Sequence, residues 1–263
     1  MDMELIYIYH SGFALLGDGF TVIMDYYRDS EDGQAQADLN RLMDGTFSHQ
    51  EAGMPEGIVH GELLRRPGKL YVLASHFHPD HFNKEVLQWR EQRPDIIFIF
   101  SKDILRHRRA QKEDAIWLKK GEEYKDETLR VRAFGSTDVG VSFLLQAGGK
   151  KIFHAGDLNN WHWMDESTEA EWKGAEKNFL YELDDLYAYT PEVDVALFPV
   201  DPRLGKKYMR GAGQFVTKIK THIFVPMHFT PEYAKANAFR DFAEAHGVRF
   251  VSLTHRGQKI EIE

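Results

Sequence analysis

The sequence contains no cysteine. This absence excludes disulfide bonds and thiolate metal ligands, so any bound metal ion must be held by histidine, aspartate or glutamate. The first residues, Met1-Asp2-Met3-Glu4, are acidic where a signal peptide would be basic, and no apolar segment approaches the length that spans a membrane. We therefore expect a cytoplasmic protein with no membrane partner.

Positive charge is also in short supply. The chain has 33 Lys and Arg against 41 Asp and Glu, which gives a formal net charge of −8. A broad nucleic-acid surface needs clustered basic residues, so we expect a small-molecule substrate and no nucleic-acid partner. The one basic run, Arg106-His107-Arg108-Arg109 with Lys112, lies in an expected helix, where it serves either as a solvated face or as a functional patch.

The most informative stretch is 74–82, because three histidines and one aspartate fall within six residues of it. It follows residues 69–73, whose β-rich apolar composition predicts a buried strand. His76 and His78 can point to the same side of an extended chain, whereas Pro79 marks a turn that carries Asp80 and His81 elsewhere. The two pairs predict one or two metal ions, with Zn²⁺ favoured over Mn²⁺ or Fe²⁺, which would position and deprotonate a water for hydrolysis.

A His-rich surface turn is the alternative interpretation, but the surrounding pattern agrees with a metal site. The string resembles the His-x-His-x-Asp-His signature of the metallo-β-lactamase superfamily, and 83–89 supplies the helix that follows it there. The resemblance spans nearly the whole chain and implies an α/β (α+β) fold, the four-layer αββα sandwich built from two β-then-α halves. Chains of this length commonly form one unit, so we expect a single domain over residues 1–263.

The resemblance also implies functional residues outside this loop. Asp157 matches the bridging metal ligand, His228 matches a late metal-binding histidine, and Asp25 matches an acidic position that holds the metal loop by accepting its backbone N–H groups. A further metal-binding histidine of the family is missing from residues 134–140. Asp138 could replace it through oxygen, Ser136 could accommodate a water, or this metal position is weak.

The implied activity is hydrolysis, in which a metal-bound hydroxide attacks a carbonyl or phosphoryl centre. His76 and His78 would form one metal position, Asp80, His81 and His228 the other, and Asp157 would bridge them, while Asp80 also orients the water. The residues with a predicted role in substrate binding are His10, Asp138, Asn159, His162 and Arg203. Arg203 is the candidate anion clamp or a structural ion-pair partner, and His10 is equally compatible with a core role or with orienting a ligand.

The leading hypothesis is a hydrolase of a small polar or anionic substrate, either a lactone or a phosphate ester. The segment around His10 resembles the entry of the ascorbate-6-phosphate lactonase branch of the superfamily, which favours this substrate class. A nuclease or phosphodiesterase of the same superfamily and a non-catalytic metal-binding regulatory protein are the alternatives.

The loosely patterned stretch 26–68, with a weak helical segment at 35–43, is interpreted as a lid or as a homo-oligomer contact.

The regular elements are expected from hydrophobic periodicity and from turn residues. Asp18-Gly19 and Gly148-Gly149 predict two tight hairpins. Helices are expected at 103–112, 166–189 and 231–246. Strands are expected at 4–10, 13–17, 20–25, 69–73, 95–100, 128–134, 141–147, 150–155, 193–200, 221–227, 248–253 and 258–262.

Overall fold

A computed structural model describes residues 3–28 and 57–263. The chain divides into two compact units, of which unit 1 comprises Met1–Trp117 with Thr254–Glu263 and unit 2 comprises Leu118–Leu253. The expected helix at 35–43 and most of the expected lid lie outside the described residues. Among the helices that are described, none is both long enough and apolar enough to cross a membrane.

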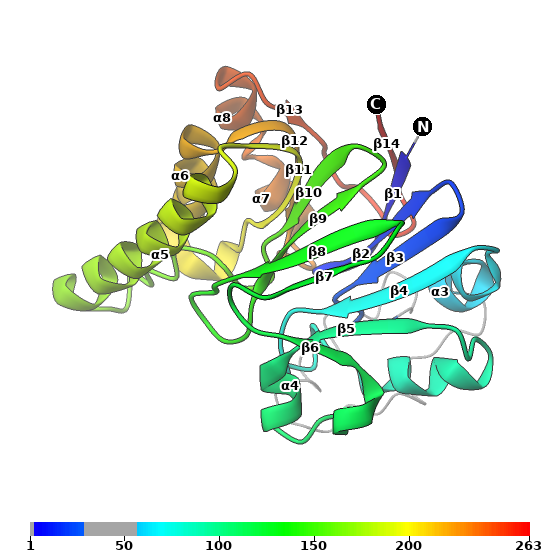
Figure 1. Ribbon diagram of the computed structural model, residues 1–263. Helices are drawn as coiled ribbons and strands as arrows, with labels where there is room; N and C mark the ends of the chain where they lie inside the picture. The colour runs from blue at the N-terminus through cyan, green and yellow to red at the C-terminus, as the bar shows by residue number, and fades with distance from the viewer. Residues whose placement is uncertain (1–2, 29–56) are drawn as a thin grey trace. The chain divides into compact units, whose positions relative to one another are not determined.

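Unit 1 contains a seven-stranded mixed sheet in the order β14-β1-β2-β3-β4-β5-β6 (Figure 1). Strands β14, β1, β2 and β3 pair antiparallel, whereas β3, β4 and β5 run parallel. The hairpin between β2 and β3 turns at the expected Asp18-Gly19. The strands are β1 (Met3–Tyr9), β2 (Gly12–Gly17), β3 (Phe20–Met24), β4 (Lys69–Ala74), β5 (Ile97–Ser101), β6 (Ile116–Leu118) and β14 (Lys259–Ile262).

Short helices pack against one face of the unit 1 sheet. They are α3 (Ile58–Gly61), η1 (Leu63–Arg65), η2 (Lys84–Glu91), α4 (Lys102–Arg106) and η3 (Lys112–Asp114). Val59, Trp89 and Ile104 from these helices join Leu70 and Val72 of β4 in one buried cluster. Residues 70 and 72 alternate along β4 and therefore face the same side of the sheet. The helix expected at 83–89 is present, but as the 3₁₀ helix η2.

Unit 2 repeats the plan with a seven-stranded sheet in the order β13-β12-β11-β10-β9-β8-β7. Strands β7 to β10 pair antiparallel, and β10 to β13 run parallel. Gly148 and Gly149 form the expected hairpin with φ of 56° and 79°, values that glycine adopts without steric cost. The strands are β7 (Glu123–Lys125), β8 (Leu129–Phe134), β9 (Ser142–Ala147), β10 (Lys150–His154), β11 (Glu192–Pro199), β12 (Lys220–Met227) and β13 (Arg249–Phe250).

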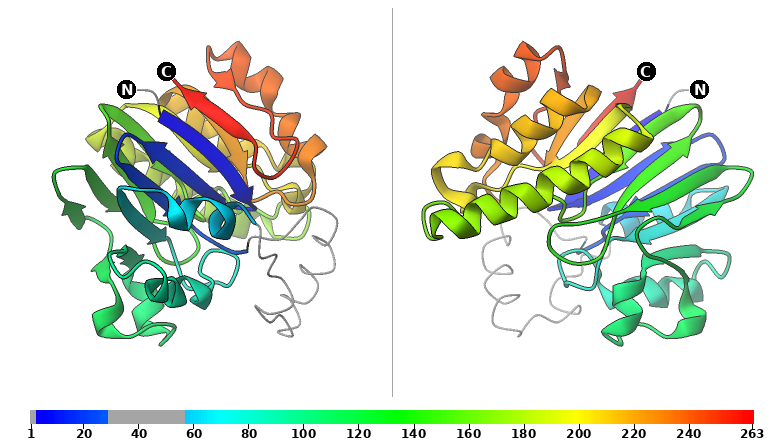
Figure 2. Two further views of the ribbon diagram at one scale, coloured as in Figure 1. Left: turned by 90° about the vertical axis from the view of Figure 1, so that its right-hand side faces the viewer. Right: turned by 60° about the vertical axis from the view of Figure 1, so that its left-hand side comes forward.

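Helices also cover one face of the unit 2 sheet, as the right-hand view of Figure 2 shows for the long helix α5. Phe179, Leu183 and Leu186 are its fully buried residues. The helix expected at 231–246 is divided into two short ones. The helices of unit 2 are α5 (Glu169–Tyr189), η4 (Pro202–Lys207), α6 (Arg210–Lys218), α7 (Tyr233–Asn237) and α8 (Arg240–Ala245).

Each unit thus joins an antiparallel part to a parallel part of a mixed sheet, which confirms the predicted α/β class. Parallel strands that end at the same edge bring their following loops together, and ligands bind there in α/β proteins.

The helix expected at 103–112 ends early, at Arg106, because Arg108 and Arg109 donate their backbone N–H groups to the carbonyls of Leu105 and Ile104. This bond pattern is a Schellman termination.

Candidate metal centre

Polar residues follow the parallel strands in both units. In unit 1, Asp25 follows β3 and Ser75 follows β4, and the Asp25 N–H bonds the Leu73 carbonyl at 2.9 Å. In unit 2, Asp201 lies two residues beyond β11 and His228 directly follows β12. The Val200 N–H bonds the Met227 carbonyl at 3.0 Å, which brings the residues after these two, Asp201 and His228, side by side. Strand register therefore decides which polar residues become neighbours.

Several of these positions have a left-handed backbone. The φ angles are 57° at His10, 46° at Asp25 and 61° at His228, and Gly156, just before Asp157, has 53°. A non-glycine residue with positive φ is uncommon and costs conformational energy. Such strain concentrates at functional sites, where the surrounding structure holds the residue in place.

Asp25 is the organising residue of the metal loop in unit 1. It is fully buried, and its Oδ1 accepts the Ser75 N–H at 2.7 Å. Its Oδ2 accepts the Ser75 hydroxyl at 2.6 Å and lies 2.7 Å from Nδ1 of His81. The predicted role of Asp25, to hold the loop through its backbone, is therefore confirmed, and the structure adds a side-chain bond to a candidate ligand.

These contacts fix which ring nitrogen each histidine presents. Because the Asp25 carboxylate only accepts, Nδ1 of His81 carries the proton and Nε2 carries the lone pair. The Ser75 hydroxyl donates to Asp25, so that Nδ1 of His76, 3.0 Å away, is the donor to the serine oxygen. A metal-ligating histidine commonly has its other nitrogen held in this way. Both rings therefore offer Nε2 to a cation.

The side chains of His76 and His78 lie together on the same side of the chain, as their spacing predicts. Nε2 of His76 lies 3.0 Å from Nδ1 of His78, and the ring centroids are 4.7 Å apart. His76 is fully buried and His78 is partly exposed. Two imidazole nitrogens that converge at the end of a rigid strand are suited to bind one metal ion.

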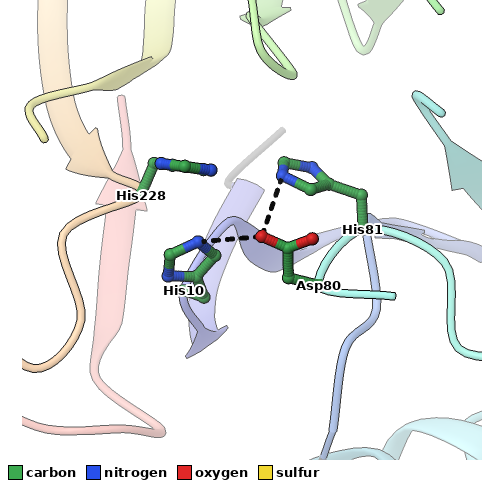
Figure 3. Close-up of side chains that lie close together, drawn as sticks. All are labelled: His10, Asp80, His81 and His228. Carbon is green, nitrogen blue, oxygen red and sulfur yellow. Dashed lines mark ion pairs between the residues drawn. The ribbon is translucent and has the colours of Figure 1, made fainter. Parts of the chain in front are cut away.

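Asp80 and His81 form a second group, which His10 joins from the end of β1. Asp80 Oδ2 lies 3.5 Å from Nε2 of His10 and 3.8 Å from Nε2 of His81. Figure 3 shows the two rings on either side of this carboxylate; it also draws His228, which belongs to unit 2. One ligand atom from each of the three residues lies within 4.8 Å of the others. The structure therefore places His10, predicted to contact substrate, among candidate ligands.

In unit 2, Asp201 plays the part that Asp25 plays in unit 1. Asp201 Oδ2 lies 3.0 Å from Nδ1 of His228, and Nε2 of this histidine lies 3.4 Å from Asp157 Oδ1. Arg203 contacts both oxygens of Asp201, its Nη2 donating to Oδ2 at 2.6 Å. Burial acts to raise the pKa of Asp201, but hydrogen bonds with His228 and Arg203 outweigh it and hold the pKa well below its usual range. Asp201 thus stays ionised and orients His228.

Asp138 lies close to Asp157 although the expected histidine is missing from its loop. A carboxylate oxygen of each lies within 4.8 Å of the other. Thr137 joins the two loops, because its hydroxyl donates to the Asn159 carbonyl at 2.6 Å and accepts the Asn159 N–H at 2.9 Å. Within unit 2, this geometry agrees with oxygen ligation by Asp138, the first of the alternatives left open by the sequence.

Asn159 and His162 are held by bonds within unit 2. Both are almost fully buried; the Asn159 side-chain oxygen accepts the Asn160 N–H at 2.8 Å. His162 Nδ1 accepts the Met164 N–H, and its Nε2 lies 3.1 Å from the Lys207 carbonyl. Burial, the largest cause, lowers the pKa of His162. Their predicted part in substrate binding stays a prediction, and the observed contacts give both residues a structural part.

The donor atoms suit a divalent cation. Zinc and related metals bind neutral imidazoles and carboxylates. Here the imidazoles have Nδ1 held by buried carboxylates, and other carboxylates lie within a few ångström of them. Sequence reasoning missed Asp201 and Ser75, which orient candidate ligands without belonging to the motif. An acidic residue just beyond an apolar strand was the available signal for Asp201.

Comparisons with known proteins agree with this site. The family described as Beta-lactamase superfamily domain matches residues 4–171. Igni18, a metallo hydrolase from the archaeon Ignicoccus hospitalis, shares the fold with a TM-score of 0.65 and 18% identity, over 100% of this chain and 99% of that one. No curated protein matches the sequence.

Two further solved structures share the fold at low identity. CmlA, a diiron β-hydroxylase from Streptomyces venezuelae, has a TM-score of 0.61 and 12% identity, over 100% of this chain and 54% of that chain. An isothiocyanate hydrolase from Delia radicum gut bacteria has a TM-score of 0.53 and 13% identity, over 98% of each chain. With more than half of its residues matched by the family, the chain belongs to the β-lactamase superfamily and has the metallo-β-lactamase fold predicted from its sequence.

Proposed function

We propose that the protein is a metal-dependent hydrolase of a small polar or anionic substrate, either a lactone or a phosphate ester. The observation that carries the proposal is that each unit holds a histidine whose Nδ1 is fixed by a buried carboxylate, His81 by Asp25 and His228 by Asp201. Membership of the superfamily and the description of Igni18 as a metallo hydrolase support hydrolysis.

The proposed ligand set is the one that the sequence resemblance implies. His76 and His78 serve one metal position, with Asp138 replacing the missing histidine, while Asp80, His81 and His228 serve the other. Asp157 is shared. Bound metal would lower the pKa of a coordinated water and polarise the bond to be cleaved. Zinc is our first expectation; a carboxylate in place of an imidazole favours harder ions, so manganese and iron belong in the test.

The protein's own residues would orient the reactants. Asp80 is the partly exposed carboxylate of its group and is the candidate to hold the attacking water and take its proton. Nε2 of His10, 3.5 Å from Asp80, would steady that carboxylate. Arg203 and the turn from Asn159 to His162 are the proposed wall that receives the substrate.

The deciding experiment loads the protein separately with zinc, manganese or iron and measures turnover of matched lactones and phosphodiesters. Asp157→Ala should abolish turnover, whereas Asp241→Ala, an exposed aspartate of unit 2, should leave it intact. The finding of CmlA on this fold, a protein described as a diiron β-hydroxylase, is a reason to include iron.

Two results would overturn the proposal. Stoichiometric metal binding without turnover of any substrate would favour a regulatory metal-binding protein. Cleavage of structured RNA that exceeds cleavage of all small substrates, with a steep dependence on salt, would favour a nuclease.

A further inference from the structure

The basic run found in the sequence lies beside the metal loop in unit 1. The Phe77 N–H donates to Asp103 Oδ2 at 3.0 Å, which joins the loop to the first turn of α4. The Phe77 ring also stacks on the His107 ring, with centroids 3.7 Å apart and planes at 12°. Both ends of α4 are thus attached to the residue that separates His76 from His78.

Aromatic rings form a row from this segment to the candidate ligands. His107 stacks on Phe77, and the Phe77 centroid lies 4.6 Å from that of His78. His107 is exposed, and Phe77 is partly exposed. A substrate group that extends outward from His78 would therefore meet the C-terminal end of α4.

Positive charge concentrates in this segment, residues 102–112, which we call the basic segment. The five basic side chains of this segment are Lys102, Arg106, Arg108, Arg109 and Lys112. Among the residues that the structure describes, none of these five forms an ion pair. In a chain of net charge −8 this is a local exception. Nε of Arg109 is buried without a hydrogen-bond partner in the described part of the chain.

Arg108 occupies a backbone position at which glycine is usual. It is the left-handed residue of the Schellman termination, with φ of 55°, and glycine takes this position without steric cost. Here an arginine with an exposed guanidinium occupies the position, although its backbone is strained there. Helix termination by itself does not require that side chain.

Arg203, the anion clamp expected from the sequence, is already engaged. Its guanidinium bonds both oxygens of the buried Asp201 carboxylate, so that the charge is balanced within unit 2. An anionic substrate group gains less from a paired arginine than from unpaired ones.

We propose that the basic segment is a binding subsite for a distal anionic group of the substrate, a carboxylate or a phosphate separated from the scissile bond by a short chain. This inference rests on the proposed hydrolase function and names its substrate class. Arg106 and Arg108 are the exposed members that would contact the anion, and the stacked rings of His107 and Phe77 form the aromatic surface under the connecting chain.

The test compares two esters of equal chain length, neutral 4-nitrophenyl pentanoate and anionic mono-4-nitrophenyl glutarate. The ratio of kcat/KM for the anionic to the neutral ester should fall about tenfold in Arg106→Ala/Arg108→Ala, in line with the loss of charged hydrogen bonds. The control Arg65→Ala/Lys177→Ala removes two exposed charges elsewhere and should keep the wild-type ratio. An unaltered ratio in the Arg106/Arg108 variant overturns the subsite.

Arg108→Gly separates function from folding. Because glycine relieves the left-handed strain, the Tm of this variant should be equal to that of the wild type or higher by about 2 °C. Its preference for the anionic ester should nevertheless fall. Arg203→Ala should instead lower kcat/KM for both esters by the same factor, because the charge of Arg203 is already paired with Asp201. A wild-type preference in Arg108→Gly would show that the arginine is only a helix terminator.

Failure of the hydrolase proposal can be distinguished from failure of the subsite. If neither ester is cleaved, calorimetry with inorganic pyrophosphate and metal-free protein still measures the basic segment, and the double variant should bind about tenfold more weakly. Equal binding by wild type and variant overturns the subsite whatever the activity. Selective loss of single-stranded RNA binding, with pyrophosphate binding intact, would overturn it in favour of a nucleic-acid contact.

Discussion

Asp201 Oδ2 lies 3.0 Å from Nδ1 of His228, at the ends of two adjacent parallel strands. The contact repeats in unit 2 what Asp25 and His81 do in unit 1 at 2.7 Å. In both cases a buried carboxylate fixes the tautomer of a histidine and leaves Nε2 for a cation.

Replacement of Asp201 by asparagine should therefore weaken metal binding about 10- to 100-fold, the usual effect of losing such a partner. Titration calorimetry measures the affinity, and ¹⁵N NMR of the His228 ring should show loss of the fixed Nδ1 proton. Asp194→Asn serves as a control, since Asp194 also lies on β11 but bonds the Lys151 N–H. Wild-type affinity in Asp201→Asn would refute the positioning role.

The metal position served by His76 and His78 should be the weaker of two, because it has lost a family imidazole. If Asp138 replaces that imidazole, Asp138→Ala should weaken this position about tenfold, and Asp138→His should tighten it. Metal titrations of the three proteins should show two unequal steps, of which only the weaker shifts. Two equal, tight steps in the wild type would contradict this prediction.

Gly211 is expected to be required for close packing of α6 against Asn159 and Asn160. A Cβ at this position of α6 would lie 1.9 Å from the Asn159 Oδ1 and 2.9 Å from the Asn160 N. Gly211→Ala should lower the free energy of unfolding by about 1 to 3 kcal/mol through overpacking. Gly174→Ala, in open space on α5, should raise it by about 0.5 to 1 kcal/mol. Urea denaturation of both variants checks the difference, and similar stabilities would count against the close contact.

Stability should fall at acid pH partly through His162. Its folded-state pKa lies below the ordinary value of 6.5, mainly because of burial, so the unfolded chain binds the proton more readily. The contribution is fully present above pH 6.5 and is lost as pH falls through the lowered pKa. Between pH 8 and pH 5, about the range in which histidine titrates, the free energy of unfolding should decline less in His162→Gln than in the wild type. The exposed His255→Gln serves as control; parallel curves for wild type and His162→Gln would exclude this role.

Local signals in the sequence correctly indicated most strands, both hairpins and the metal loop. Alternating apolar residues and short glycine turns act within a few residues, so that they can be recognised without knowledge of distant partners. Two elements show the limit. Helix α6 contains Gly211 and Gly213, which give it weak intrinsic propensity, and the helix at 103 ends early because of backbone bonds made at Arg108 and Arg109.

The sequence by itself determined the metal loop and the family, since His76, His78, Asp80 and His81 are close in the chain and their spacing carries the chemistry. Only the tertiary structure decided what orients and surrounds them. Asp201 meets His228 across 27 residues through the register of β11 and β12, and His107 meets Phe77 through the packing of α4. Such partners depend on long-range strand pairing and side-chain packing, which leave no fixed spacing in a sequence.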